Sequence, residues 1–225
     1  RSRQVTTVQH FTIATRESRL ALWQAEHVKA LLEQQGRSEE ARVVLTQVQP
    51  ASAEQARRKA LALSQWLREH QQARQALATL APALKLAADD HELLTEQSLV
   101  LEKLKRHDEM EAVLRQLMRT RPQDPHAYNA LGYSLADRKL RLTEARQLIA
   151  KAVELAPEDP YIQDSLGWVE FRLGRLQEAL RILQAAYKAK PDAEIAAHLG
   201  EVLWTLGQQQ EAGTFWREGL LLKAD

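Results

Sequence analysis

The chain contains no cysteine and few glycines, prolines or aromatic residues. It has 225 residues, with 0 Cys, 8 Gly, 7 Pro and 5% aromatic residues. The absence of cysteine excludes disulfide bonds and thiol chemistry and fits any compartment. No apolar run approaches the roughly 18 residues that a membrane-spanning helix needs. The 31 basic and 30 acidic residues nearly cancel, which gives no reason to expect a nucleic acid as partner.

The chain does contain a repeat of about 34 residues in its second half. Leu-Gly pairs occur at 131–132, 166–167 and 199–200, and a Glu-Ala pair follows each of them at 144–145, 178–179 and 211–212. Prolines close the successive units at positions 122, 157 and 191. A fixed period of this length predicts stacked helical hairpins, whose function usually lies in an extended surface.

The recurring small residues have a packing role. Two helices approach closely only where side chains are small, so Gly132, Gly167 and Gly200 are predicted to lie at helix crossings. A glycine inside a helix costs about 1 kcal/mol relative to alanine, and its recurrence therefore indicates a gain in packing. Gly174 and Gly207 mark the expected turn of their hairpins. The Asp-Pro pairs at 124–125 and 159–160 predict helix N-caps.

These residues resemble the tetratricopeptide repeat. The resemblance covers residues 125–225 as three well-formed repeats and residues 17–124 as degenerate repeats, after an N-terminal extension at 1–16. It implies an all-α fold, a tetratricopeptide-repeat superhelical solenoid of about six helical hairpins, with no β-sheet beyond a short strand near 11–14. The repeat without insertions is carried by Leu166, Gly167, Gly174, Ala179, Leu183, Ala186 and Pro191.

The degenerate repeats have leucine-rich predicted cores. For 91–124 the core residues are Leu94, Leu101, Leu104, Met110, Leu114 and Leu117. For 57–90 they are Leu61, Leu67, Ala76, Leu80 and Ala83. Pro82 is expected inside the second helix, with a kink or an early helix start there. For 17–50 we expect a helix to Gln35, a turn at Gly36 and a second helix. The buried stripe predicted there is Leu20, Trp23, His27, Leu31 and Leu32.

In this repeat class the first helix of each hairpin lines the concave face, so its inward positions are the candidate binding residues. We predict that an extended or helical segment of a partner protein binds there, with aromatic residues as hot spots. The predicted partner-binding residues are His126, Asn129, Tyr133, Asp137, Tyr161, Asp164, Trp168, Phe171, Arg172, Glu201 and Trp204. Further inward positions are Ala136, Glu194, Ala197 and Thr205. The alternative for each aromatic residue is packing between repeats. The chaperone-tail clamp of the family needs Lys and Asn where this chain has Asn129/Tyr133 and Asp164/Trp168, which disfavours that ligand class.

Segments 131–138, 164–174 and 196–204 are similar to the C-terminal repeats of a proteobacterial tetratricopeptide lipoprotein. One member of that group is the adaptor of a carboxyl-terminal processing protease and holds the protease and its cell-wall hydrolase substrates. The resemblance implies a non-catalytic scaffold in the periplasm, anchored to the outer membrane in the full-length protein. The lipid-bearing cysteine and further repeats would then lie upstream of Arg1. A cytoplasmic location is the alternative.

Residues 11–32 resemble a different family, the first strand and helix of porphobilinogen deaminase (hydroxymethylbilane synthase). The resemblance implies that Arg16 and Ser18 match residues that contact cofactor and substrate there. That family attaches its dipyrromethane cofactor through a cysteine, which this chain lacks, and the family's catalytic aspartate has no matching context. The alternative function is therefore a fusion or fragment related to this enzyme of tetrapyrrole synthesis.

No other pattern points to catalysis or to a cofactor. The seven histidines pair with no cysteine and form no HxxxH or HExxH motif, and no GxGxxG or GxxxxGK[ST] loop occurs. We therefore predict that the chain is not an enzyme and has no cofactor and no metal site. A self-assembling repeat module is a further alternative. The last helix, near 209–222, carries more apolar residues than the Trp216 and Leu220 expected to pack in its own hairpin, which predicts weak homodimerisation through this C-terminal edge.

Overall fold

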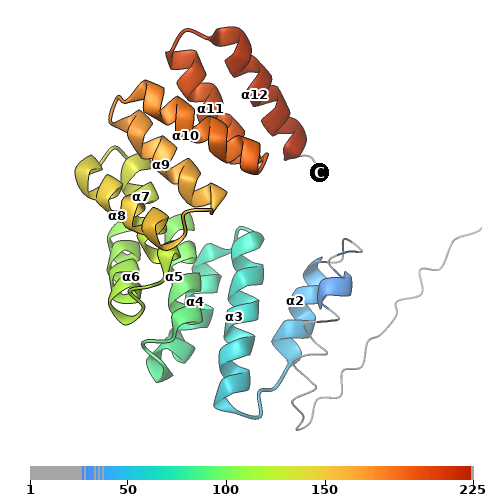
Figure 1. Cartoon of the computed structure of the whole chain (residues 1–225). Helices are drawn as coiled ribbons and strands as arrows, with labels where there is room; N and C mark the ends of the chain where they lie inside the picture. The colour runs from blue at the N-terminus through green and yellow to red at the C-terminus, as the bar shows by residue number, and fades with distance from the viewer. Residues whose placement is uncertain (1–26, 28, 33, 35, 37, 224–225) are drawn as a thin grey trace, which may run out of the picture. The chain divides into compact units, whose positions relative to one another are not determined.

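The structure is a computed structural model, and it describes residues 27, 29–32, 34, 36 and 38–223. Figure 1 shows the helices in chain order. The chain forms two compact units, Arg1–Met110 and Glu111–Asp225. The boundary between the units lies inside one helix, α6 (His107–Thr120).

The described part of the first unit is built from helices around a leucine-rich core. Its helices before α6 are α2 (Ser38–Gln47), α3 (Ala53–Glu69), α4 (Ala73–Leu86) and α5 (His91–Lys103). Helices α3 and α4 form a hairpin, and α5 packs against both of them. The residues buried together in this core are Leu45, Trp66, Leu67, Ala76, Leu80, Leu93 and Val100.

The second unit contains three consecutive helical hairpins. Their helices are α7 (Pro125–Asp137) with α8 (Leu142–Leu155), α9 (Pro160–Arg172) with α10 (Leu176–Ala189), and α11 (Ala193–Thr205) with α12 (Gln209–Leu222). The described residues form no β-strand, which confirms the predicted all-α hairpin fold, and the strand considered near 11–14 lies outside them. Within this described part, no helix combines the length and apolarity required to cross a membrane.

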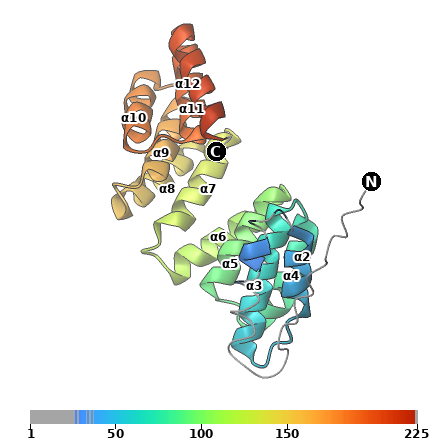
Figure 2. The same ribbon diagram turned by 90° about the vertical axis from the view of Figure 1, so that its right-hand side faces the viewer.

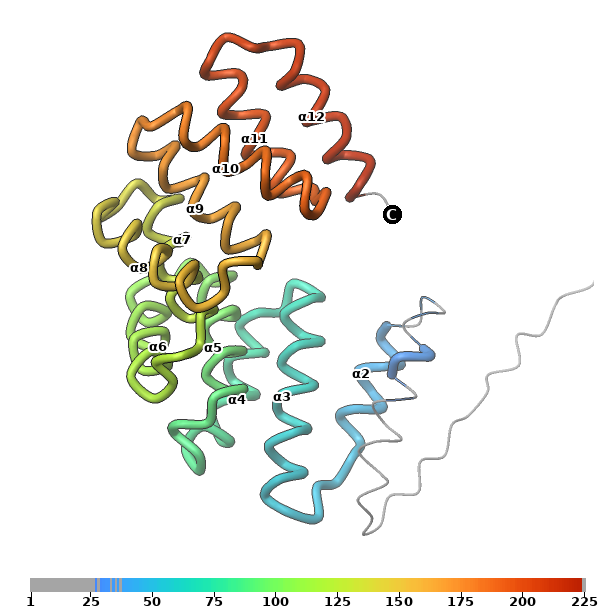
Figure 3. The backbone as a smooth tube through the Cα atoms, viewed as in Figure 1, coloured from blue at the N-terminus to red at the C-terminus, as the bar shows by residue number. Residues whose placement is uncertain are grey.

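A residue with positive φ lies in the turn of each hairpin. The backbone trace in Figure 3 shows the chain reversing direction between the helices of a hairpin. These residues are Gly36, Gln71, Lys105, Lys139, Gly174 and Gly207, spaced 33 to 35 residues apart. The same two backbone hydrogen bonds recur at the last five turns. In the α9–α10 turn, the N–H of Gly174 donates to Phe171 O and the N–H of Arg175 to Glu170 O, both at 2.9 Å. This is the Schellman arrangement of a helix C-terminus. The turns therefore confirm the repeat period in both units, whereas the sequence pattern shows it clearly only over residues 125–225.

Aspartate side chains begin the first helices of the second unit. The carboxylate of Asp124 accepts the backbone N–H of His126 at 2.9 Å, and the carboxylate of Asp159 accepts that of Tyr161 at 2.8 Å. Pro125 and Pro160 lie in the first turn of their helices, where the missing N–H costs nothing. Both predicted N-caps are confirmed.

The three crossing glycines have no room for a side chain. A Cβ atom at Gly167 would lie 2.5 Å from Leu183 Cγ, and one at Gly132 would lie 2.6 Å from Ile149 Cγ1. At Gly200 the same atom would lie 2.5 Å from Trp216 Cδ1, at the crossing of α11 and α12, which lie side by side in Figure 2. Each pair of helices is therefore in backbone-to-side-chain contact at its glycine, as predicted.

Most predicted core residues of the degenerate repeats are buried. Leu94, Leu101, Met110, Leu114, Leu117, Leu67, Ala76 and Leu80 are at most 4% exposed. Leu61, Ala83 and Leu104 are partly buried against the first-unit core. Helix α4 runs from Ala73 through Pro82 to Leu86, so Pro82 lies inside the helix as expected.

The predicted burial of His27, Leu31 and Leu220 is wrong. His27 is exposed and Leu31 is 44% exposed, because the buried side of that segment centres on Leu32, which packs with Ala41, Val44 and Val48. Leu220 is 70% exposed, because Gly219 occupies the contact with α11 and the next residue is turned about 100° away from it. Leu20 and Trp23 lie outside the described residues.

Two glutamates are buried among the described residues. Glu96 is 2% exposed and accepts hydrogen bonds from Arg68 Nε at 3.0 Å and Ser64 Oγ at 3.2 Å. Glu170 is also 2% exposed, and it accepts from Arg146 and Arg175 at 2.6 and 2.9 Å. Paired arginines compensate the loss of hydration of such carboxylates.

Candidate functional site

The first helices of the three hairpins, α7, α9 and α11, lie next to one another in the second unit and share one side. Helix α7 packs against α9, and α9 packs against α11. We call the side that carries the predicted inward positions the inner face. Its residues are His126, Asn129, Tyr133, Ala136 and Asp137 from α7, Tyr161, Asp164, Trp168, Phe171 and Arg172 from α9, and Glu194, Ala197, Glu201, Trp204 and Thr205 from α11.

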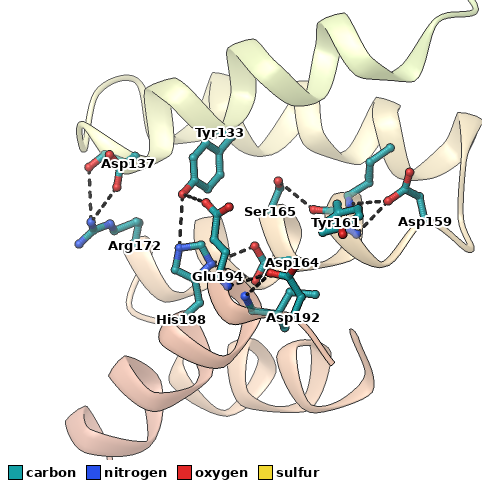
Figure 4. Close-up of polar contacts among 12 residues, drawn as sticks. Tyr133, Asp137, Asp159, Tyr161, Asp164, Ser165, Arg172, Asp192, Glu194 and His198 are labelled. Carbon is teal, nitrogen blue, oxygen red and sulfur yellow. Dashed lines mark hydrogen bonds and ion pairs between the residues drawn. The ribbon is translucent and has the colours of Figure 1, made fainter. Parts of the chain in front are cut away.

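A hydrogen-bonded series of polar side chains connects the three helices, as Figure 4 shows. The hydroxyl of Tyr133 donates to Glu194 Oε1 at 2.8 Å and lies 3.4 Å from His198 Nε2. His198 Nδ1 lies 2.9 Å from both carboxylate oxygens of Asp164. Asp164 and His198 are 4% and 7% exposed, so this polar pair is buried between α9 and α11. Such a fully connected network fixes one arrangement of neighbouring helices.

Aromatic stacking and a cation–π contact lie beside this polar pair. The indole of Trp168 stacks on the imidazole of His198 with ring centroids 4.1 Å apart, and it lies 5.3 Å from Phe171. The guanidinium carbon of Arg172 lies 4.1 Å from the Trp168 ring centroid. Arg172 also donates to the carboxylate of Asp137 at 3.4 Å. Because Trp168 is only 3% exposed, it contributes packing between repeats and is not available to a partner in this conformation.

The carboxylates of the inner face create a negative local field. Burial raises the pKa of the Tyr133 hydroxyl far above its ordinary value, and the nearby charges of Glu194, Asp137 and Asp164 raise it further. Burial also raises the pKa of Asp164, and its hydrogen bond to His198 opposes that shift. Burial is the largest cause of both shifts, and the neighbouring carboxylates add to them.

The series Asp164–His198–Tyr133 has the order of carboxylate, imidazole and hydroxyl found in nucleophilic catalysis. The 3.4 Å separation between His198 Nε2 and the hydroxyl is long for a hydrogen bond, and the hydroxyl donates to Glu194. Its raised pKa disfavours the oxyanion that a nucleophile needs. The series therefore supports helix packing. Among the residues that the structure describes, no three His, Cys, Asp or Glu side chains are grouped to hold a metal ion.

The structure divides the predicted site residues by exposure. The exposed ones are His126, Asp137, Tyr161, Glu201 and Trp204, the half-buried ones Asn129, Tyr133, Phe171 and Arg172, and the buried ones Asp164 and Trp168. The predicted aromatic residues do not all gather in one cluster. Trp168 and Phe171 lie together, whereas Trp204 lies against Trp216 of α12, with ring centroids 5.6 Å apart. A binding role for these residues stays a prediction.

Sequence reasoning missed the part played by His198. It lies next to an inward position and is buried, and its partner Asp164 precedes it by 34 residues, one repeat period. Complementary residues one period apart at neighbouring helix positions were the signal that could have identified the pair. The same kind of spacing joins Arg57 to Asp90, 33 residues apart, with an Nε–Oδ2 distance of 2.6 Å.

Successive helical hairpins follow one another with a constant period and share a face of polar and aromatic residues. This architecture defines a helical repeat protein. Comparison with known families agrees, because the family described as "Tetratricopeptide repeat" matches residues 165–219. The chain contains tetratricopeptide repeats.

Two curated relatives share part of this sequence. The TPR repeat-containing protein PA4667 of Pseudomonas aeruginosa is 44% identical over 135 residues, which are 60% of this chain and 23% of that protein. The chloroplastic PsbB mRNA maturation factor Mbb1 of Chlamydomonas reinhardtii is 38% identical over 74 residues, 32% of this chain and 11% of that protein. The chain therefore spans less than a quarter of either relative.

Solved structures share the fold at lower identity. TTC0263, a thermophilic TPR protein of Thermus thermophilus, has a TM-score of 0.67 and 22% identity over 74% of this chain and 91% of that one. Pseudomonas aeruginosa pilF has a TM-score of 0.63 and 17% identity over 75% of this chain and 77% of that one. MamA from Desulfovibrio magneticus RS-1 reaches 0.60 at 19% identity, over 75% of this chain and 96% of that one. These likenesses show the fold alone.

A second family also matches. The "Porphobilinogen deaminase, dipyromethane cofactor binding domain" matches residues 11–190, so by extent of sequence the chain belongs to that family as well. The described residues of this span form helices α2 to α10 of the repeat. The residues present do not fit the cofactor, because the chain has no cysteine to attach it. Arg16 and Ser18, which match the family's binding residues, lie outside the described residues.

Proposed function

We propose that the chain is a non-catalytic protein-binding scaffold and that partners bind the inner face of its second unit. The observation that carries the proposal is Trp204, which is 49% exposed on the inner face, near the C-terminal end of α11. Large aromatic side chains that lose their remaining exposure on binding are the residues that contribute most to protein interfaces.

The exposed residues rest on a rigid base. Trp204 lies against Trp216, whose indole N–H donates to Ala197 O at 3.2 Å. The neighbouring helices α9 and α11 are joined by the buried Asp164–His198 pair. A face whose supporting side chains are already ordered loses less entropy when a partner binds, which favours affinity.

Affinity capture from a bacterial lysate tests the proposal, with the whole chain as bait. Trp204→Ala should lose captured proteins that the wild type retains, while the variant keeps its helical circular dichroism spectrum. Leu140→Ala is the matched control, because Leu140 is 46% exposed in the same unit but lies in the α7–α8 turn. Equal capture by both variants and the wild type would place the binding surface elsewhere.

The particular role we propose is that of a periplasmic adaptor for a carboxyl-terminal processing protease. The support is the similarity of segments 131–138, 164–174 and 196–204 to the repeats of such an adaptor, together with the 44% identity to a tetratricopeptide repeat protein of Pseudomonas aeruginosa. Mixing the purified chain with a purified processing protease should give a complex in analytical size-exclusion chromatography. The complex should be weakened by Trp204→Ala and not by Leu140→Ala. Two separate peaks for the wild type would contradict the adaptor role.

The match to porphobilinogen deaminase makes tetrapyrrole synthesis the second candidate function. Incubation of the chain with porphobilinogen tests it, because turnover would consume the pyrrole and release a linear tetrapyrrole. We expect no consumption, since the cysteine that carries the cofactor in that family is absent. Measurable turnover above a heat-treated control would overturn the non-catalytic assignment.

A further inference from the structure

Helix α11 presents an exposed surface that carries two glutamates and one tryptophan. Glu194, Ala197, Glu201 and Trp204 are all exposed and lie on one side of the helix. Glu201 and Trp204 are three residues apart, which places their Cβ atoms about 5–6 Å from each other. Glu194 lies about 10 Å further along the helix axis. We call these four residues the α11 face.

In the preceding repeat, an arginine of the chain itself lies between aromatic rings and a carboxylate. On α9, the guanidinium of Arg172 lies 4.1 Å from the Trp168 ring centroid and 5.9 Å from that of Phe171, and it donates to the Asp137 carboxylate at 3.4 Å. An arginine held between aromatic rings and a carboxylate gains from both cation–π and charge-assisted contacts.

The α11 face offers one aromatic ring and one carboxylate, and Glu201 stands at the position of Trp168. One repeat later in the sequence, Trp204 stands at the position of Phe171, and Thr205 stands at the position of Arg172. Glu201 supplies a carboxylate beside the ring, and among residues 38–223 it forms no ion pair. The hydroxyl of Thr205 donates to Glu201 O at 2.8 Å, so it is turned back onto its own helix.

A groove between α11 and α12 extends the same surface. It has a volume of about 680 Å³ and is lined by Asp192, Ala193, Glu194, Ala197, Trp216, Gly219, Leu220 and Lys223. The small residues leave room for aliphatic side chains, and Trp216 supplies an apolar wall. Two carboxylates and one lysine are its charged groups, so the groove and the α11 face together favour a positively charged ligand.

We infer that the α11 face and its groove bind a basic segment of another protein, with an arginine of that segment held between Trp204 and Glu201. This inference rests on the proposed scaffold function and specifies the chemistry of the partner. Glu194 attracts a second basic side chain. Because an extended chain advances about 3.3 Å per residue, the two basic residues are about three residues apart. Aliphatic residues of the segment occupy the groove.

Selection from a phage-displayed library of random twelve-residue peptides tests the inference. The wild-type chain is the bait, and the matched counter-bait carries Glu201→Gln and Trp204→Ala. We expect sequences enriched on the wild type over the counter-bait to contain arginine or lysine in excess of the input library, with a pair about three residues apart.

Affinity measurements on one enriched peptide give the second readout. Replacing its key arginine by citrulline, which has the same shape without the charge, should weaken binding about fivefold or more. Glu201→Gln should give a loss of similar size, and Glu211→Gln, an exposed carboxylate in the first turn of α12, should give none.

The outcomes separate the inference from the proposed function. Enriched peptides without excess basic residues, or equal binding of the arginine and citrulline peptides, would overturn the inference while leaving a peptide-binding inner face. No enrichment over the counter-bait would overturn both. A second copy of the chain as occupant would appear as a dimer in sedimentation that Trp204→Ala abolishes, and that result would also overturn the inference.

Discussion

Replacing Gly167 by alanine tests the packing account of the fold most closely. The added Cβ would lie 2.5 Å from Leu183 Cγ and 2.8 Å from Leu183 Cδ2, far inside van der Waals contact. Leu183 is 0% exposed and belongs to the core with Ala179 and Leu199, so it has no free space to move into. Overpacking of this kind costs about 1–3 kcal/mol.

The substitution also has a favourable component, which fixes the expected magnitude. Alanine is better than glycine inside a helix by about 1 kcal/mol. The difference between the two effects predicts that Gly167→Ala destabilises the protein by about 1 kcal/mol. In a Leu183→Ala background the clashing atoms are gone, so the same substitution should stabilise by about 1 kcal/mol. The sign of the effect therefore reverses.

Urea unfolding followed by circular dichroism at 222 nm measures all four members of this cycle. Gly213→Ala is the control, because a Cβ there would meet only the far end of the Arg217 side chain, at 3.4 Å. This control substitution should stabilise by about 1 kcal/mol. Equal effects of Gly167→Ala in the presence and absence of the Leu183 side chain would refute the argument that the glycine is required by the crossing.

Four further predictions follow from individual contacts. Lys139→Gly should stabilise the protein by up to about 1 kcal/mol in the same urea assay, because Lys139 has a φ of 55° that favours glycine. An unchanged unfolding free energy would show that this turn is unstrained. The pKa of Glu111 is held at about 2, below its ordinary 4.5, chiefly by hydrogen bonding to Arg141. The stabilisation that the ionised Glu111 gives the fold is therefore full above pH 4.5 and is lost as the pH falls towards 2. Glu111→Gln should flatten the dependence of the unfolding free energy on pH in that window. His198→Ala should destabilise by about 3 kcal/mol, because it leaves a buried carboxylate without its partner, and a thermal melt equal to wild type would contradict this. Leu221, which is 71% exposed, should contribute to weak dimerisation, so sedimentation over a concentration series should show less dimer for Leu221→Glu than for wild type.

The backbone of the second unit could be predicted from its sequence because small residues and caps act locally. A glycine in a crossing, a proline after an aspartate and a glycine in a turn each specify the backbone where they stand. Gln71 and Lys105 in the first hairpins, and Lys139 between α7 and α8, adopt the same turn geometry without a glycine. These three turns could therefore be placed only by the repeat period.

Side-chain burial on the inner face could not be predicted in the same way. The period places Trp168 and Trp204 at neighbouring inward positions, yet the first is 3% exposed and the second 49%. The difference depends on the residues of the next repeat. His198 of α11 stacks on Trp168, whereas Trp204 lies against Trp216 of its own hairpin. Contacts between side chains one period apart are tertiary, and a pattern of small residues carries no information about them.

Photocrosslinking from the inner face tests most directly whether partners bind there. A photoreactive benzoylphenylalanine is placed at position 204, and in a second protein at position 140, whose native side chains are similarly exposed. After irradiation in bacterial cells, we expect defined crosslinked bands from position 204 that are absent from position 140. Bands from position 140 alone, or none from position 204, would contradict the claim that this face binds other proteins.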